Sequence, residues 1–380
     1  MSRVGLLLTG GGARAAYQAG VLRGVSEILN QRECPFPVIT GISAGAINAS
    51  YLSCYADDFR KSTEGLWNLW SEIKTDTIFK TSRLSLFRIG IRWIRDLVFG
   101  GVTGISNATY LLNADPLAKL LAGKLDMERL KHNCDTGVLH GVAFTATNYK
   151  TGTAVSFYDG SQTIDQWLRT SRIGIRSDLK IEHVLASASI PILFPPVKLG
   201  NVFYGDGSVR MSAPLSPPIH LGADRVFSVG VRFYREPEET LKLNLESVMD
   251  SISLVDIGGV MLNSIFLDSM DADLERMERI NRTIQTMTEE QKKNHPNRLK
   301  EIPVYAVRPS EDLGKLAAGA FKEFPQSLRY LLRGIGGSHQ KGWDLLSYLA
   351  FEQDYTSKLL KLGYDDVLRE ADAVRKFIKG

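Results

Sequence analysis

The sequence predicts an α/β fold, in which a mostly parallel central sheet is covered by helices on both faces and followed by a helical C-terminal extension. Three observations predict it. The first 55 residues alternate between short apolar runs and helical patterns, further apolar runs continue to about residue 307, and only helical patterns follow. Strands that alternate with helices favour parallel pairing, because parallel strands need long crossover connections. We expect an α/β domain at 1–310 and a helical extension at 311–380.

The N-terminal elements follow a strand–turn–helix order that occurs twice. An apolar run at Val4–Thr9 ends at three glycines, and a helical pattern follows over Ala13–Leu29. A second strand is predicted at Pro37–Thr40, and the next helix begins near Gly45. If these two strands are parallel neighbours, both turns lie at their carboxyl edge, where open α/β sheets bind ligands.

The middle of the chain predicts further strands and then long helices. A hairpin is predicted where two apolar runs, Val142–Thr147 and Thr153–Tyr158, flank a turn. A helix is expected at Glu182–Ser189, before a proline. The remaining predicted strands are Val202–Tyr204, Arg225–Val231 and Pro303–Val307.

Composition excludes several classes of protein. The 380 residues are 44% hydrophobic and carry a net charge of +4, which fits a folded protein and argues against a disordered chain or a nucleic-acid binder. Three cysteines without a CxxC pair argue against a disulfide framework or a structural zinc site and fit a reducing, cytoplasmic compartment. No signal-peptide pattern and no apolar run of about 20 residues occurs. Export by another route stays open, and the oligomeric state is not predicted.

The first turn, Gly10-Gly11-Gly12-Ala13-Arg14-Ala15, has three interpretations. It matches the dinucleotide-binding pattern G-x-G-x-x-A, but the acidic residue that this pattern needs at the end of the second strand is absent. The glycines would also simply permit a tight turn. Alternatively, the backbone N–H groups at the helix start form an oxyanion hole.

The second turn, Gly41-Ile42-Ser43-Ala44-Gly45, is a G-x-S-x-G pattern between a strand and a helix. This is the context of a nucleophile elbow, in which a sharp turn exposes the serine hydroxyl. Gly41 and Gly45 avoid clashes across the turn, and the N–H of Ala44 can help to hold an oxyanion. The alternative is that Ser43 is a plain helix N-cap.

A serine nucleophile needs a base, and the sequence offers histidines and one distinctive carboxylate. The six histidines are His132, His140, His183, His220, His295 and His339. Only the last two come late enough for the order of an α/β-hydrolase triad, and both lie in polar, helical contexts. Asp206 follows a short apolar strand and lies between two glycines, which suits either a base or a Gly-Asp-Gly turn.

Together these segments resemble the patatin-like phospholipase family. Gly10–Ala15 is similar to the family's G-G-G-x-R-G loop, and Gly41–Gly45 to its G-x-S-x-G elbow. Asp206–Gly207 is similar to its D-G motif, and Ala186–Pro196 to its A-S-x-S-x-P-x-x-F-x-P segment. The resemblance covers roughly residues 4–230 and implies a three-layer α/β fold.

The resemblance implies a serine acyl hydrolase of the bacterial patatin-like type that acts on lipid esters, as a phospholipase A, a lysophospholipase or an esterase. Ser43 would form the acyl-enzyme, Asp206 would accept its proton, and backbone N–H groups of Gly10–Ala13 would hold the oxyanion. Arg14 would either orient this loop or meet a lipid phosphate. No metal or organic cofactor is implied.

The sequence departs from the family pattern at two positions. Ala15 replaces the final glycine of the loop, which is tolerable if this residue has helical dihedral angles. Ser208 replaces the Gly or Ala that follows Asp-Gly, so the hydrogen bonding of Asp206 is expected to differ. The alternatives to the enzyme are a catalytically weak lipid-binding or interaction module with the same fold and a Ser-His-Asp hydrolase.

Residues 84–99 mix large apolar residues with Arg88, Arg92 and Arg95, which fall on one helical face. Such a segment can lie on an anionic bilayer, which would make this a peripheral membrane protein with a phospholipid substrate. It can equally pack on the core as an ordinary helix with solvated arginines.

Overall fold

The computed structural model describes residues 2–103, 109–246, 251–295, 299–337 and 342–380. Within them the chain forms one ten-stranded sheet, whose neighbours β10-β9-β1-β2-β3 are all parallel. Beyond β3 the sheet continues through β4, β6 and β5, and β8 pairs with β3 and β7. The strands are β1 Val4–Leu8, β2 Val38–Ile42, β3 Gly141–Asn148, β4 Thr153–Gly160, β5 Trp167–Arg169, β6 Arg172–Arg176, β7 Val197–Leu199, β8 Val202–Asp206, β9 Arg225–Val229 and β10 Val304–Val307.

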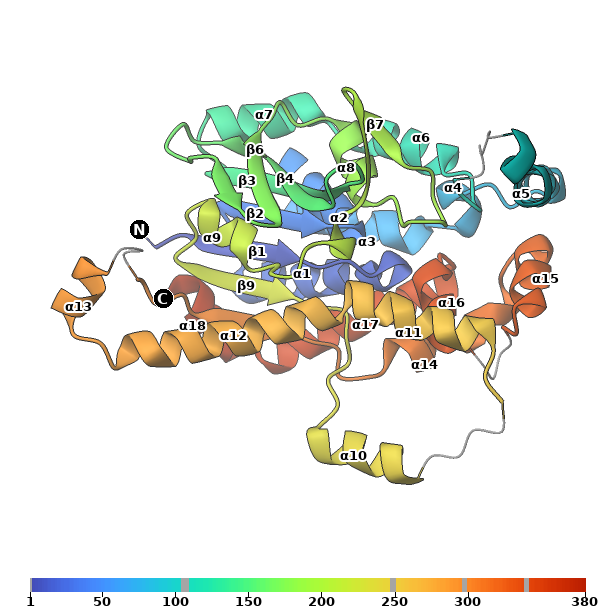
Figure 1. Ribbon diagram of the computed structural model, residues 1–380. Coiled ribbons are helices and arrows are strands. Elements are labelled where there is room, and N and C mark those ends of the chain that lie inside the picture. The colour runs from blue at the N-terminus through green and yellow to red at the C-terminus, as the bar shows by residue number, and fades with distance from the viewer. Residues whose placement is uncertain (1, 104–108, 247–250, 296–298, 338–341) are drawn as a thin grey trace.

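Helices cover both faces of this sheet (Figure 1). On one face lie α1, α2, α3 and α17, and on the other lie α9 and α12, so the predicted fold class is confirmed. The helices are α1 Ala16–Leu29, α2 Ala44–Cys54, α3 Phe59–Glu72, α4 Thr75–Ile78, α5 Arg83–Thr103, α6 Asp115–Lys124, α7 Met127–Asp135, α8 Ile181–Ser187, α9 Ser216–His220, α10 Pro237–Glu246, α11 Leu254–Phe266, α12 Asp268–Gln285, α13 Glu289–Asn294, α14 Leu313–Leu316, α15 Gln326–Gly334, α16 Trp343–Leu349, α17 Gln353–Arg369 and α18 Ala371–Lys379.

The first strand shows why the sequence forms a sheet buried on both sides. All five residues of β1 are buried, and its leucines alternate between the two faces. Leu6 and Leu8 belong to the core on the α1 side, whereas Leu7 belongs to the core under α9 and α12. A strand that is covered on both faces has no polar side, which explains the continuous apolar run.

The C-terminal helices share the core of the α/β domain. Helix α17 lies against α1 at close range, because a Cβ at Gly20 would come within 2.1 Å of the Leu360 carbonyl oxygen. In the same way, a Cβ at Gly363 would come within 2.1 Å of the Tyr17 carbonyl oxygen. Glycine therefore permits backbone contact between the two helices. The division of the chain into 1–310 and 311–380 stays a prediction.

Several elements differ from the prediction in extent. The hairpin of β3 and β4 is confirmed, and β8 extends two residues further than predicted, so that Asp206 is its last residue. The short strands β5, β6 and β7 were not predicted, because three to five residues carry too little periodicity to recognise. In the described part of the chain, no helix combines the length and hydrophobicity that crossing a membrane requires.

Candidate active site

Ser43 lies at a sharp turn between β2 and α2. Its backbone has φ 57° and ψ −131°, a strained conformation for a residue with a side chain. The turn is crowded: a Cβ at Gly45 would come within 2.2 Å of the Leu8 carbonyl oxygen, and one at Gly41 within 2.5 Å of the Gly45 carbonyl oxygen. Glycine at both positions therefore permits a serine to be held in this conformation.

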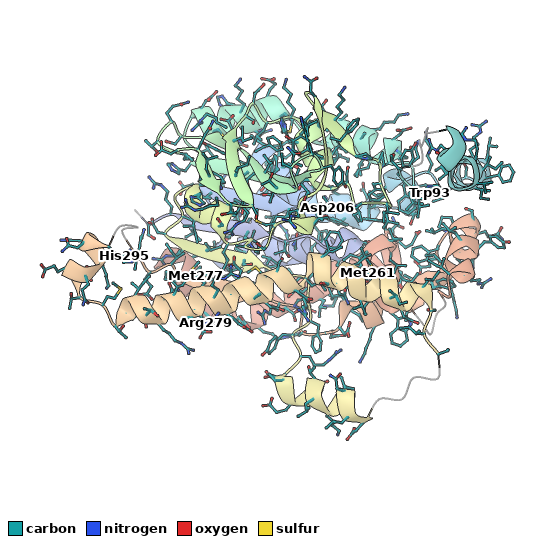
Figure 2. All side chains as sticks on the ribbon, in the orientation of Figure 1. Trp93, Asp206, Met261, Met277, Arg279 and His295 are labelled. Atoms are coloured by element: carbon teal, nitrogen blue, oxygen red, sulfur yellow. The ribbon has the colours of Figure 1, made fainter. Side chains whose placement is uncertain are left out.

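The Ser43 hydroxyl donates a hydrogen bond of 2.5 Å to Oδ2 of Asp206. The two residues are 163 positions apart and meet because β8 pairs with β3, where Asp206 lies opposite Ala146. Ser43 is 1% exposed and Asp206 is fully buried. The structure thus places the predicted nucleophile and the predicted base in direct contact (Asp206 is labelled in Figure 2).

Burial raises the pKa of Asp206 to about 7. Hydrogen bonds from Ser43 and from the N–H of Ser208 act in the opposite direction, since they favour the charged carboxylate. A base whose pKa lies near neutrality can both take a proton from a serine and return it to a leaving group. The electrostatics therefore suit a carboxylate that works in both steps of an acyl transfer.

The glycine loop lies directly beside this pair. A Cβ at Gly10 would come within 3.0 Å of the Ser43 Cβ. The N–H of Arg14 bonds the Gly11 carbonyl and is the first donor used by the short 3-10 helix Gly12–Ala15. The N–H groups of Gly11, Gly12 and Ala13 precede it, and such groups have no partner inside the helix. N–H groups at a helix start are of the kind that binds anions, and the N–H of Ala44 has the same position at the start of α2.

Arg14 holds the loop against the C-terminal region. It is buried, its Nη2 forms a 2.9 Å ion pair with Asp344, and its Nε donates to the Ser347 hydroxyl at 2.7 Å. Its guanidinium also lies 4.5 Å from the centre of the Tyr348 ring. These contacts support the loop-orienting role rather than contact with a lipid phosphate. The three partners belong to α16 and had no recognisable sequence signal.

Ser187 supports the turn at Ser43, a role that the sequence patterns did not indicate. Its hydroxyl accepts a 3.0 Å hydrogen bond from the N–H of Ser43 and donates one of 2.6 Å to the Thr145 carbonyl. Thr147 has a parallel role, because its hydroxyl donates to the Asp206 carbonyl at 2.7 Å. Ser187 lies in the segment 186–196 that resembles the family, and this resemblance is the sequence feature that could have pointed to it.

The two departures from the family pattern fit the structure. Ala15 has φ −67° and ψ −10°, so its methyl group is accommodated without strain. The N–H of Ser208 donates to Oδ1 of Asp206 at 2.9 Å, and the buried Ser208 hydroxyl also acts to lower the pKa of this carboxyl, against the larger effect of burial. At the neighbouring Gly207, a Cβ would come within 2.0 Å of the Thr145 carbonyl oxygen.

An apolar cavity adjoins Ser43. Ser43 contributes the polar part of its lining, and every other lining side chain is aliphatic or aromatic. The cavity volume is about 30 Å³, much smaller than the roughly 150 Å³ that holds a benzene molecule in an engineered protein cavity. It is lined by Gly12, Ser43, Ala44, Ile47, Leu69, Trp70, Ile73, Ile78, Leu117, Leu120, Ala188, Ile190, Phe194 and Phe351.

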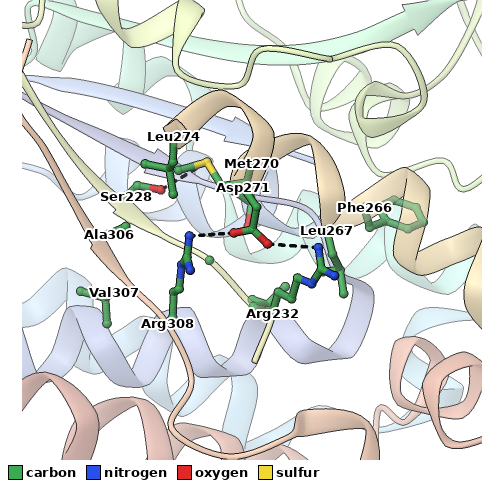
Figure 3. Close-up of a pocket in the computed structure, with 13 residues that line it drawn as sticks. Ser228, Arg232, Phe266, Leu267, Met270, Asp271, Leu274, Ala306, Val307 and Arg308 are labelled. Atoms are coloured by element: carbon green, nitrogen blue, oxygen red, sulfur yellow. Dashed lines mark hydrogen bonds and ion pairs between the residues drawn. The ribbon is translucent and has the colours of Figure 1, made fainter. Parts of the chain in front are cut away.

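A second cavity lies at the carboxyl ends of β9 and β10, where charged side chains adjoin apolar ones such as Met270 and Leu274 (Figure 3). Asp271 lies between two arginines there, at 3.1 Å from Arg232 and 2.7 Å from Arg308. The volume of about 10 Å³ is close to the minimum that a single water needs. Because Arg232 and Arg308 already pair with Asp271, and Arg232 pairs with Asp268 as well, we do not assign this cavity to the substrate.

The histidines that the structure describes lie in other environments. His183 accepts a hydrogen bond from the N–H of Lys180, and His220 stacks on Trp167 at 4.8 Å between ring centres. His295 directly follows α13, and Figure 2 shows it far from Asp206. His339 lies outside the described residues. Within the described ranges, no group of three or more His, Cys, Asp or Glu side chains is arranged to hold a metal ion.

Solved structures of low similarity cover most of the chain. Human GIVD cytosolic phospholipase A2, in complex with a methyl gamma-linolenyl fluorophosphonate inhibitor and terbium chloride, is 14% identical, with a TM-score of 0.44. That match covers 100% of this chain and 60% of the human one. VipD from Legionella pneumophila is 12% identical with a TM-score of 0.35, over 98% of this chain and 67% of that one. At such low identities and TM-scores, these similarities support no statement about function.

The sequence comparison with protein families is more specific. No curated protein matches the sequence. The model of the patatin-like phospholipase family matches residues 6–219, which is more than half of the chain. The matched range contains the glycine loop, the elbow and Asp206. The chain therefore belongs to the patatin-like phospholipase family.

Proposed function

We propose that this protein hydrolyses lipid acyl esters with a Ser43–Asp206 dyad. Family membership implies lipid acyl hydrolase activity in general terms. The observation that carries the mechanism is the buried 2.5 Å hydrogen bond from the Ser43 hydroxyl to the Asp206 carboxyl, formed at a strained turn beside the glycine loop. Serine, base and oxyanion donors are the three parts that acyl transfer requires.

In the first half of the reaction, Ser43 Oγ bonds to the ester carbonyl carbon and its proton passes to Asp206. The negative charge that develops on the carbonyl oxygen lies near the N–H groups of Gly11–Ala13 and Ala44. When the C–O bond of the ester breaks, the leaving alcohol takes the proton from Asp206. The products at this stage are a free alcohol and an acyl-enzyme on Ser43.

In the second half, water replaces the alcohol. The water oxygen attacks the acyl carbonyl carbon, and Asp206 accepts a proton from this water. The same N–H groups stabilise the second oxyanion. The Ser43 oxygen then leaves with the proton from Asp206, which releases the carboxylic acid and restores the starting state. One carboxylate serves both halves because its pKa lies near neutrality.

The apolar cavity supports an acyl chain as the bound part of the substrate. It begins at Ser43 and has aliphatic and aromatic walls, which match a hydrocarbon. Its volume of about 30 Å³ is too small for a long acyl chain, so the lining side chains of α4 and α6 must move apart when substrate binds. We propose a phospholipid or lysophospholipid as substrate, met at a membrane surface through residues 84–99.

Hydrolysis assays with matched variants test this proposal. Soluble short-chain esters and phospholipid vesicles are supplied to the wild type, Ser43→Ala and Asp206→Asn. We expect both variants to lose hydrolysis of both substrates while keeping the wild-type circular dichroism spectrum. His183→Gln serves as a control, because its side chain caps α8 and is expected to leave activity intact. Activity that persists in either dyad variant would refute the mechanism.

A further inference from the structure

Helix α5 exposes a line of large apolar side chains. They recur at alternating spacings of three and four residues and therefore share one helical face. Isolated apolar residues on a surface are ordinary, but a contiguous row marks a site of interaction. The row, called the α5 stripe below, consists of Leu84, Phe87, Ile91, Ile94 and Val98, which are between 49% and 65% exposed.

The opposite side of α5 is held by the protein, which fixes the direction of the stripe. Ile89 is buried, and the indole N–H of Trp93 donates to the Tyr110 carbonyl at 3.0 Å. At about 100° of rotation per residue, these two positions lie on the far side of the helix from the stripe. The stripe therefore points away from the core.

Arginines border the α5 stripe. Arg88 and Arg95 are exposed and lie within about 40° of its edge on the helical wheel, and Arg92 lies further round, over the Tyr110 ring. The helix contains four arginines and one acidic residue, Asp96. An apolar face bordered by cations matches the boundary between acyl chains and anionic headgroups.

A second copy of the chain would fit this face less well. The spacing of the α5 stripe is also that of a coiled-coil seam, whose flanking positions usually carry complementary charges. Here the flanking charges are Arg88 and Arg95, and Asp96 already pairs with Arg95 at 2.8 Å. Two such helices would bring arginine towards arginine without a matching carboxylate. Charge therefore favours an anionic lipid surface over self-association.

Helix α15 continues the apolar face. It carries the exposed Tyr330 and Leu331. The Ser327 hydroxyl at its start donates to the Thr81 carbonyl, two residues before α5. Figure 1 shows α5 and α15 at the same end of the molecule. The apolar side chains of the two helices can thus meet one surface together.

The start of α11 lies next to α15 at this end. The N–H of Val255 donates to the Ile335 carbonyl at 3.2 Å, which joins the two helices. Beside this bond, Leu254 is 68% exposed, and Ile257 and Met261 are exposed on the following turns. Three elements that are distant in sequence therefore present apolar side chains at one end of the fold.

This end of the fold is connected to the active site. Tyr110, which Trp93 contacts, pairs with Ile192, and the N–H of Leu111 donates to the Ile192 carbonyl at 2.8 Å. Two residues further along, Phe194 lines the apolar cavity beside Ser43. A bilayer that contacts α5 would therefore lie next to the segment that borders the cavity.

We propose that the α5 stripe, its bordering arginines and the adjoining apolar residues of α15 and α11 form the face that docks this protein onto an anionic lipid bilayer. Its biological purpose rests on the proposed hydrolysis of lipid esters, but the docking itself does not require catalysis. The bilayer supplies apolar volume for the α5 stripe and phosphate charge for Arg88 and Arg95. Docking brings the cavity next to its substrate.

Vesicle sedimentation tests the proposal independently of catalysis. The measurements use the full chain with Ser43→Ala, so that lipid is not consumed, and vesicles of phosphatidylcholine with or without phosphatidylglycerol. The parent should bind the anionic vesicles more tightly.

Adding Arg88→Gln and Arg95→Gln should lower partitioning onto anionic vesicles roughly 30-fold and leave partitioning onto neutral vesicles unchanged. Adding Phe87→Ser and Ile94→Ser should lower partitioning onto anionic vesicles roughly 100-fold.

The matched control replaces an exposed arginine and an exposed isoleucine at the other end of the molecule. Arg279→Gln with Ile280→Ser on α12 should bind as the parent does; Figure 2 labels Arg279 far from Trp93. Short-chain ester hydrolysis by the same surface variants, made with Ser43 intact, should equal the wild type. Equal partitioning onto both kinds of vesicle, or unchanged binding by the α5 variants, would overturn the proposal. A dimer that becomes a monomer when the α5 stripe is changed would overturn it in favour of a second copy.

Discussion

Replacing the proposed base should make the protein more stable as well as inactive. In the unfolded chain Asp206 has an ordinary carboxyl pKa near 3.8, and burial raises it to about 7 in the folded state. Between these two values the unfolded chain releases a proton that the folded chain keeps, so stability falls as pH rises. Below about pH 4 this penalty is absent, and above about pH 7 it is complete.

The size of the effect follows from the difference in pKa. About three pKa units correspond to about 4 kcal/mol of folding free energy above neutral pH. Asp206→Asn removes the penalty and keeps an acceptor for the Ser208 N–H and a group that can pair with the Ser43 hydroxyl. For 380 residues the entropy of unfolding is roughly 0.8 kcal/mol/K, so the melting temperature should rise by about 5 °C.

Thermal unfolding of the wild type and Asp206→Asn, at about pH 4 and at about pH 8, measures this difference. The two melting curves should coincide at acid pH and separate at alkaline pH, with the variant higher. The exposed Asp165→Asn is the matched control and should change the melting temperature by less than about 1 °C. A variant that is less stable at alkaline pH, or a difference that does not depend on pH, would refute the reasoning about Asp206.

Three further substitutions test the surroundings of the dyad. Ser187→Ala removes partners from the Ser43 N–H and the Thr145 carbonyl, so kcat should fall about 100-fold with little change in KM, as steady-state kinetics would show. Ser208→Ala deletes a buried hydroxyl that favours the charged form of Asp206, so the rise of kcat/KM with pH should shift to a higher pH; an unchanged pH profile would show that this hydroxyl does not act on Asp206. Leu120→Trp fills part of the apolar cavity, so kcat/KM should fall for long acyl chains and not for short ones.

The sequence alone predicted the local parts of the site but not how they meet. The turns that contain Gly10–Ala13 and Ser43 could be predicted because each is a short pattern between a strand and a helix. The contact between Ser43 and Asp206 depends on the antiparallel pairing of β8 with β3. No local pattern specifies that pairing, so the sequence proposed a dyad without its geometry.

Other features depend on packing between distant segments. The hydrogen bond from Ser43 to Ser187 joins residues 144 positions apart, and Arg14 meets Asp344 across 330 positions. The arginines of α5 were visible as a helical face in the sequence. The exposed row that begins at Leu84 was not, since exposure depends on which side of the helix packs against the protein.

In the proposed mechanism Ser43 carries the acyl group, and trapping the acyl-enzyme tests this directly. The wild type and Ser43→Ala are mixed with a phospholipid, quenched in acid, digested and analysed by mass spectrometry. We expect a peptide that contains Ser43 and has gained the mass of one acyl chain in the wild type, and no acylated peptide in the variant. An acyl group on another residue, or hydrolysis by Ser43→Ala, would contradict this mechanism.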